Sequence, residues 1–93
     1  MTTKTAAKAT AKHLARRAWA VNQVLATVSN RTTPADYYER LADYAELLQA
    51  RVEECAEVSP EGTKKAVLAV RGAANGARRD ADYARKMQDR YAY

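Results

Sequence analysis

The chain of 93 residues has no phenylalanine and contains only one tryptophan, one cysteine and one histidine. The single cysteine, Cys55, excludes a disulfide within the chain. It leaves one conceivable pair of nucleophile and base, with His13, but His13 falls in a basic run and Cys55 in an apolar seam. The sequence also lacks a glycine-rich phosphate loop and a zinc-binding set of ligands. We therefore expect a protein that is not an enzyme and that holds no metal or cofactor.

Large aliphatic side chains are scarce as well. The sequence has 21 alanines but only six leucines and seven valines, and it has no isoleucine. A chain of this length buries only about 60–65% of its extended surface on folding, so a core built from alanine is thin. We expect helices that pack closely through alanine, or a second copy of the chain that adds buried surface as a homodimer.

Long apolar runs are missing. No stretch approaches the 18 consecutive apolar residues that a membrane-spanning helix requires. No apolar segment follows the first lysines, so we expect no secretory signal and a cytoplasmic protein. The frequent use of alanine, arginine and valine is typical of a high-GC bacterium, or of a phage or other mobile element that such a bacterium carries.

Glycine and proline, which often interrupt helices and strands, are also rare, with three and two residues. Each proline follows a hydroxyl residue, as Thr33-Pro34 and Ser59-Pro60. A hydroxyl N-cap followed by proline at the first helical position is a strong signal for a helix start. Asp36, three residues after Thr33, adds a pattern that resembles a capping box.

Between these joints, apolar residues recur every three or four positions, which predicts three long amphipathic helices at about 3–29, 34–57 and 60–91. The first has the seam Ala7, Ala11, Leu14, Ala18, Val21, Leu25 and Val28. Short joints between long helices favour an all-α fold, an antiparallel three-helix bundle. Gly72 and Gly76 in the third helix predict a bend or a close contact between helices.

The first dozen residues offer no apolar side chain larger than alanine after Met1. We therefore expect residues 1–12 to form a basic extension that frays, and residues 13–93 to form a single helical domain.

Charge is segregated along the chain, in the order basic, acidic, basic. Lys4, Lys8, Lys12 and Arg16 form a row at every fourth position, and residues 1–33 contain no acid. The second helix carries an acidic stripe beside its apolar seam, made of Asp36, Glu39, Asp43, Glu46, Glu53 and Glu57. Facing stripes of opposite charge select the partner and the orientation of packed helices. One interpretation of the basic row is therefore that it pairs with this acidic stripe inside the bundle.

In the other interpretations, exposed side chains bind a partner molecule. Six tyrosines without a phenylalanine suit half-buried sites and interfaces, because tyrosine keeps one polar end. Our main hypothesis is a small protein-interaction module, which would be an adaptor, an assembly subunit or an inhibitor. Its candidate partner-binding residues are Trp19, Tyr37, Tyr38, Tyr83, Tyr91 and Tyr93.

The alternative hypothesis is a protein that binds the backbone of a nucleic acid, alone or as a subunit of a nucleoprotein complex. It depends on the net charge of +5 and on clustered basic side chains. Its candidate residues are Lys4, Lys8, Lys12, Arg16, Arg17, Arg71, Arg78, Arg79, Arg85 and Lys86.

Overall fold

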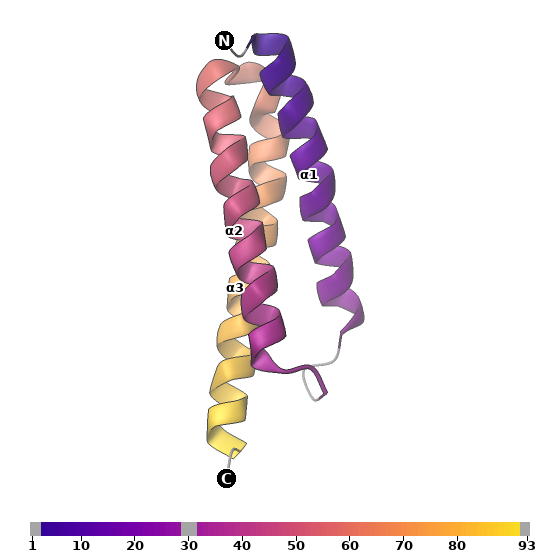
Figure 1. Ribbon diagram of the computed structural model, residues 1–93, viewed down its shortest axis with the longest axis vertical. Helices are drawn as coiled ribbons and strands as arrows, with labels where there is room; N and C mark the ends of the chain where they lie inside the picture. The colour runs from indigo at the N-terminus through magenta and orange to yellow at the C-terminus, as the bar shows by residue number, and fades with distance from the viewer. Residues whose placement is uncertain (1–2, 29–31, 92–93) are drawn as a thin grey trace.

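The computed structural model describes residues 3–28 and 32–91, and its regular secondary structure is entirely helical over these ranges. The elements are α1 (Lys4–Thr27), α2 (Ala35–Val58), the short 3-10 helix η1 (Glu61–Thr63) and α3 (Lys64–Tyr91). The three long helices lie side by side, with α2 antiparallel to α1 and α3 (Figure 1). The predicted all-α three-helix bundle is therefore confirmed.

Helix α1 is continuous across the predicted boundary at residue 12. Thr3 caps it, because the Thr3 hydroxyl accepts a hydrogen bond of 3.1 Å from the backbone N–H of Ala6. Ala7 and Ala11 are buried in the bundle. The row of lysines is thus held on a packed helix from Lys4 onward, and the separate behaviour of residues 1–12 stays a prediction.

The predicted start of α2 is wrong by one residue. Pro34, not Thr33, is the N-cap, and no side chain caps this helix. The ψ angle of Pro34 is 147°, which keeps this residue extended, so the helix begins only at Ala35. The Pro34 carbonyl instead accepts a hydrogen bond of 3.1 Å from the N–H of Tyr37.

Ser59 ends α2 and does not start α3. Its N–H donates to the Cys55 carbonyl at 3.0 Å, so the α2 ladder runs up to this residue. A single 3-10 turn follows Pro60, and the buried Thr63 hydroxyl donates to the Ser59 carbonyl at 2.8 Å. The α-helix proper starts at Lys64, which is four residues later than predicted.

The core is made mostly of alanine, as predicted. Twelve of the eighteen buried apolar residues of the described chain are alanines. The six larger ones are Leu14, Val21, Tyr38, Leu48, Val52 and Val70. The predicted seam of α1 is confirmed from Ala7 to Val21, while Leu25 and Val28 pack against the core half-buried.

Helix α3 passes through Gly72 and Gly76 without interruption. A Cβ atom built at either glycine would meet nothing within 4 Å. The predicted close helix contact at these glycines is therefore wrong for the described bundle, and this face of α3 is open. None of the helices of the described residues is long and apolar enough to cross a membrane.

Candidate interaction surface

The acidic stripe of α2 is paired with α3. Three arginines spaced seven residues apart on α3, Arg71, Arg78 and Arg85, each bind acids of α2. One glutamate partner of each arginine steps back along α2 by the same interval, as Glu53, Glu46 and Glu39. Equal steps in opposite directions are what an antiparallel helix pair with a coiled-coil-like repeat produces. We call this set the arginine ladder.

Arg78 forms the best-connected rung of the ladder. Its Nη2 lies 2.6 Å from Glu46 Oε1 and 2.8 Å from Asp43 Oδ1, and its Nε donates to Glu46 Oε2 at 3.1 Å. Hydrogen bonding to Arg78 lowers the pKa of the Glu46 carboxyl, and the two acids raise the pKa of the Arg78 guanidinium. Bidentate geometry of this kind fixes the register of α2 on α3.

The other rungs differ in completeness. Arg85 binds both Asp36 and Glu39, and hydrogen bonds to these acids raise the pKa of its guanidinium. Arg71 reaches only Glu53, with 3.7 Å from Nε to Oε1, because alanine occupies position 50 where the other rungs have an aspartate. Of the predicted stripe, Glu57 is exposed and has no ion pair among the described residues.

The ladder decides between two interpretations of the basic row on α1. No ion pair of the described chain involves Lys4, Lys8, Lys12 or Arg16, and all four side chains are exposed. The interpretation that this row pairs with the acidic stripe of α2 is wrong, because α3 neutralises the stripe. The seven-residue spacing of Arg71, Arg78 and Arg85 was the signal in the sequence that pointed to α3.

The ladder also divides the candidate residues for nucleic-acid binding. Arg71, Arg78 and Arg85 form ion pairs with α2 within the bundle. The exposed candidates that have no ion pair among residues 3–28 and 32–91 are Lys4, Lys8, Lys12, Arg16, Arg17, Arg79 and Lys86. Most of this set belongs to α1.

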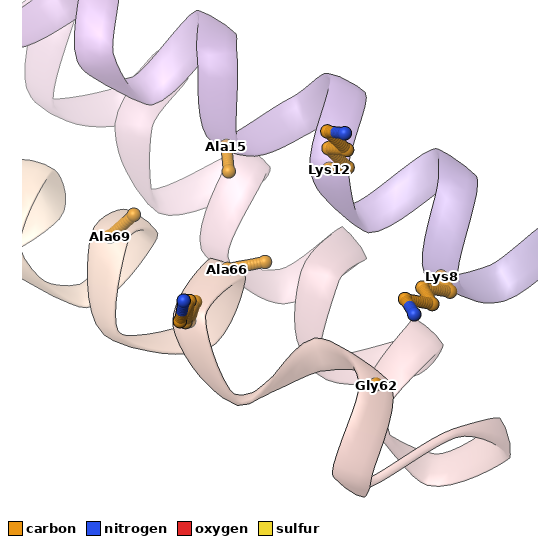
Figure 2. Close-up of a pocket in the computed structure, with 7 residues that line it drawn as sticks. Lys8, Lys12, Ala15, Gly62, Ala66 and Ala69 are labelled. Carbon is orange, nitrogen blue, oxygen red and sulfur yellow. The ribbon is translucent and has the colours of Figure 1, made fainter.

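A groove between α1 and the start of α3 gathers part of the row. It has a volume of about 460 Å³ and is lined by Lys8, Lys12, Ala15, Gly62, Lys65, Ala66 and Ala69. Figure 2 shows Ala15 on α1 opposite Ala66 and Ala69 on α3, with Lys8 above Gly62. The lining contains three lysines and no acid. We call it the α1–α3 groove; the sequence alone did not reveal that Lys65 joins Lys8 and Lys12.

The aromatic candidates divide into exposed and buried residues. Trp19 is 64% exposed, Tyr83 is 50% exposed, and Tyr37 is also exposed. The prediction for Tyr38 is wrong, because this side chain is 1% exposed and forms part of the core. Its hydroxyl has no hydrogen-bond partner among residues 3–28 and 32–91.

Two of the tyrosine predictions cannot be placed. Tyr93 and the side chain of Tyr91 lie outside the described residues. Conversely, the sequence patterns did not single out three exposed side chains, Tyr44, Leu47 and Leu68. Tyr44 follows Tyr37 by one heptad, and that spacing was the available signal in the sequence.

The two residues considered for catalysis, His13 and Cys55, lie in different environments. His13 is exposed, and Cys55 is half-buried against the core. The described residues contain no group of three or more histidine, cysteine, aspartate or glutamate side chains that could hold a metal ion. The expectation of a non-enzymatic protein stays a prediction.

Comparison of the chain with known protein families, curated proteins and solved structures finds no match.

Proposed function

We propose that the chain is a small helical protein-interaction module, which acts in the cytoplasm as an adaptor, an assembly subunit or an inhibitor. The observation that carries this proposal is the exposure of Trp19 in a protein with so few large apolar side chains. Among the side chains that the structure describes, six apolar residues larger than alanine are buried, and six large ones are exposed: Trp19, Tyr37, Tyr44, Leu47, Leu68 and Tyr83.

Single exposed leucines are ordinary on protein surfaces, so Leu47 and Leu68 carry no argument. Tryptophan and tyrosine are different, because they are enriched at the centres of protein interfaces and contribute much of the binding energy there. Trp19 lies four residues beyond Ala15, so it extends the same face of α1 that lines the α1–α3 groove. An exposed aromatic side chain beside charged residues is the usual composition of such a contact.

The test is photo-crosslinking from position 19. A chain that carries a photoreactive amino acid in place of Trp19 is expressed in the cells that naturally produce it, and adducts are identified after nuclease treatment. The matched control places the same amino acid at Ala20, which is also exposed but lies about 100° around α1. We expect discrete protein adducts from position 19 and few from position 20. The absence of protein adducts from position 19 would refute the proposal.

A second candidate function is supported by the unpaired basic row of α1. Lys4, Lys8, Lys12 and Arg16 are exposed without ion pairs among the described residues, so they are available to phosphates. Backbone contacts to duplex DNA make the logarithm of affinity fall with the logarithm of salt concentration, with a slope of about −0.9 per neutralised phosphate.

The discriminating measurement is binding to a labelled duplex and a labelled single strand across a salt series, for the full chain and for one without residues 1–12. Tight binding with a steep salt slope that the truncation reduces would favour the nucleic-acid function. A dissociation constant no better than about 10⁻⁴ M at physiological salt is ordinary non-specific binding and would favour the protein-interaction module.

A further inference from the structure

The α1–α3 groove combines a basic rim with an apolar floor. Lys8 and Lys12 rise from α1 on one side and Lys65 from α3 on the other. Between them, the floor is made of the side chains of Ala15, Ala66 and Ala69 (Figure 2). Alanine on a helix surface lets another helix approach to the short end of the usual interaxial range, about 8 Å.

The bundle already contains one example of the helix that such a surface binds. Helix α2 buries small side chains in the core, including Ala42 and Ala45, and its acidic stripe meets the arginine ladder of α3. Helix α2 is therefore an acidic amphipathic helix seated on a basic, alanine-rich surface. The α1–α3 groove presents the same combination on the other side of α3.

The face around the groove continues far enough to hold a helix of several turns. Gly72 lies three residues beyond Ala69 on α3, and Gly76 lies seven beyond, so both follow the same face. Apart from the neighbouring residues of α3 itself, no atom of the described residues lies within 4 Å of a Cβ built at either glycine. The distance from Gly62 to Gly76 along the helix is about 20 Å, which corresponds to roughly four turns.

A second copy of this chain does not fit the groove. A two-fold symmetric contact places the same patch on both subunits, so the lysines of one copy would face the lysines of the other. The acidic stripe of α2 is no substitute, because Arg78 and Arg85 already bind most of it within each copy. These charges favour a different protein as the occupant.

We propose that the α1–α3 groove binds an acidic amphipathic helix of a partner protein and thereby completes a four-helix bundle. Carboxylates on the two edges of that helix pair with Lys8 and Lys12 on one side and with Lys65 on the other. Its small apolar residues cover the alanine floor, and Trp19 packs against its next turn. The proposal rests on the protein-interaction function, and it is preferred over a nucleic-acid ligand because phosphates gain nothing from an alanine floor.

The probe is a synthetic peptide of about 18 residues, or five turns, with glutamates on both edges of an alanine–leucine seam. A matched peptide carries lysine in place of each glutamate. Binding is followed by the anisotropy of the labelled peptide and by the fluorescence of Trp19, the only tryptophan of the chain. We expect the acidic peptide to bind with a blue shift of the Trp19 emission, and the basic peptide not to bind.

The variant that tests the groove is Lys8→Glu/Lys12→Glu/Lys65→Glu. Its control is Arg16→Glu/Arg79→Glu/Lys86→Glu, which makes the same change in net charge at exposed positions outside the lining. We expect the groove variant to weaken binding of the acidic peptide at least about tenfold and the control to weaken it less than about threefold. The variant Lys8→Ala/Lys12→Ala/Lys65→Ala removes the same charges without adding carboxylates. Thermal unfolding of each protein shows whether it is still folded.

Three results would overturn the proposal. The first is equal weakening by the groove and control variants, because this would mean that net charge alone attracts the peptide. The second is tighter binding of a 20-base-pair duplex than of the acidic peptide, lost in the groove variant, which would assign the groove to nucleic acid. The third is a protein adduct at position 19 that survives in the groove variant. This last result would leave the protein-interaction function standing, whereas the absence of any adduct in the unmodified chain would remove that function itself.

Discussion

Arg78 of α3 binds Glu46 of α2 through two hydrogen bonds, Nη2 to Oε1 at 2.6 Å and Nε to Oε2 at 3.1 Å. The same guanidinium also reaches Asp43. This rung lies between two others at intervals of seven residues, so it fixes the register of the α2–α3 pair where alanines provide little shape specificity. Most of the candidate basic residues left over for a partner then lie on α1.

Replacement of Arg78 by alanine should destabilise the bundle more than replacement of its neighbour Arg79. Arg78→Ala leaves Asp43 and Glu46 without their shared cation, and we expect a loss of about 1 kcal/mol in the free energy of unfolding, the upper end for exposed ion pairs. Arg79→Ala removes an exposed arginine that has no ion pair among the described residues, so the expected change is within about 0.5 kcal/mol. Urea unfolding at low and high salt measures both. Equal effects, or a difference that salt does not reduce, would contradict the assignment.

The lowered pKa of Glu46 predicts a loss of stability in acid. A carboxyl whose pKa is lower in the folded protein binds fewer protons there than in the unfolded chain, so falling pH favours unfolding. The contribution is present above the ordinary value of 4.5 and disappears as the pH falls through the lowered pKa. Since Glu46 is half-exposed, solvent screening reduces the effect to a few tenths of a kcal/mol.

Unfolding followed from pH 6 to pH 2.5 checks this prediction. Glu46→Gln should flatten the dependence of stability on pH below about 4.5, since it removes the titrating carboxyl. Glu54→Gln is the control, because Glu54 is exposed and has no ion pair among the described residues. If the two variants give the same pH profile, the hydrogen bonds from Arg78 do not influence the titration.

The incomplete rung at Arg71 can be filled. Ala50 is exposed and occupies the position that corresponds to Asp43 and Asp36 in the other rungs. Ala50→Glu should give Arg71 a second carboxylate and raise the free energy of unfolding by about 0.5 kcal/mol at low salt. The double variant Ala50→Glu/Arg71→Ala should lose this gain. A stabilisation that persists without Arg71 would show that position 50 acts through something other than the ladder.

The helices, their seams and the acidic stripe follow from the sequence because each is a local periodicity. The partner of the stripe is harder to assign, because both α1 and α3 are basic and only the seven-residue spacing of Arg71, Arg78 and Arg85 distinguishes α3. The adjacent tyrosines show a second limit. Tyr37 and Tyr38 both fall on the apolar side of the pattern, yet a rotation of about 100° leaves one exposed and buries the other. The groove is a third case, since Lys65 joins Lys8 only once the register of α1 on α3 is set.

The buried hydroxyl of Tyr38 should be dispensable. It has no hydrogen-bond partner in the part of the chain that the structure describes, and an unsatisfied buried polar group costs about 1–3 kcal/mol. Tyr38→Phe keeps the ring and should leave stability unchanged or raise it by up to about 1 kcal/mol. Tyr38→Ala should cost about 3 kcal/mol, because this ring is among the largest fully buried side chains. Thermal unfolding compares the two; a clear loss in Tyr38→Phe would mean that the hydroxyl is hydrogen-bonded after all.

Substitution of Gly72 and Gly76 by alanine tests whether these glycines serve the stability of the fold or binding at the open face of α3. Each glycine sits inside a helix with free space around its missing Cβ, so Gly72→Ala and Gly76→Ala should each stabilise the free chain by about 0.5–1 kcal/mol. Gly62→Ala is the comparison, because its Cβ would come within 2.8 Å of Ser59 Oγ and 3.2 Å of Lys8 Cδ, and it should gain less. Urea unfolding at two protein concentrations makes the measurement. Destabilisation by Gly72→Ala, stronger at the higher concentration, would mean that this face contacts a second copy of the chain and would contradict its assignment to a partner helix. If a partner helix lies on this face of α3, Gly72→Ala and Gly76→Ala should unfold at higher urea concentration than the unmodified chain. They should nevertheless bind the acidic peptide more weakly, because the added methyl groups hold the partner helix away from α3.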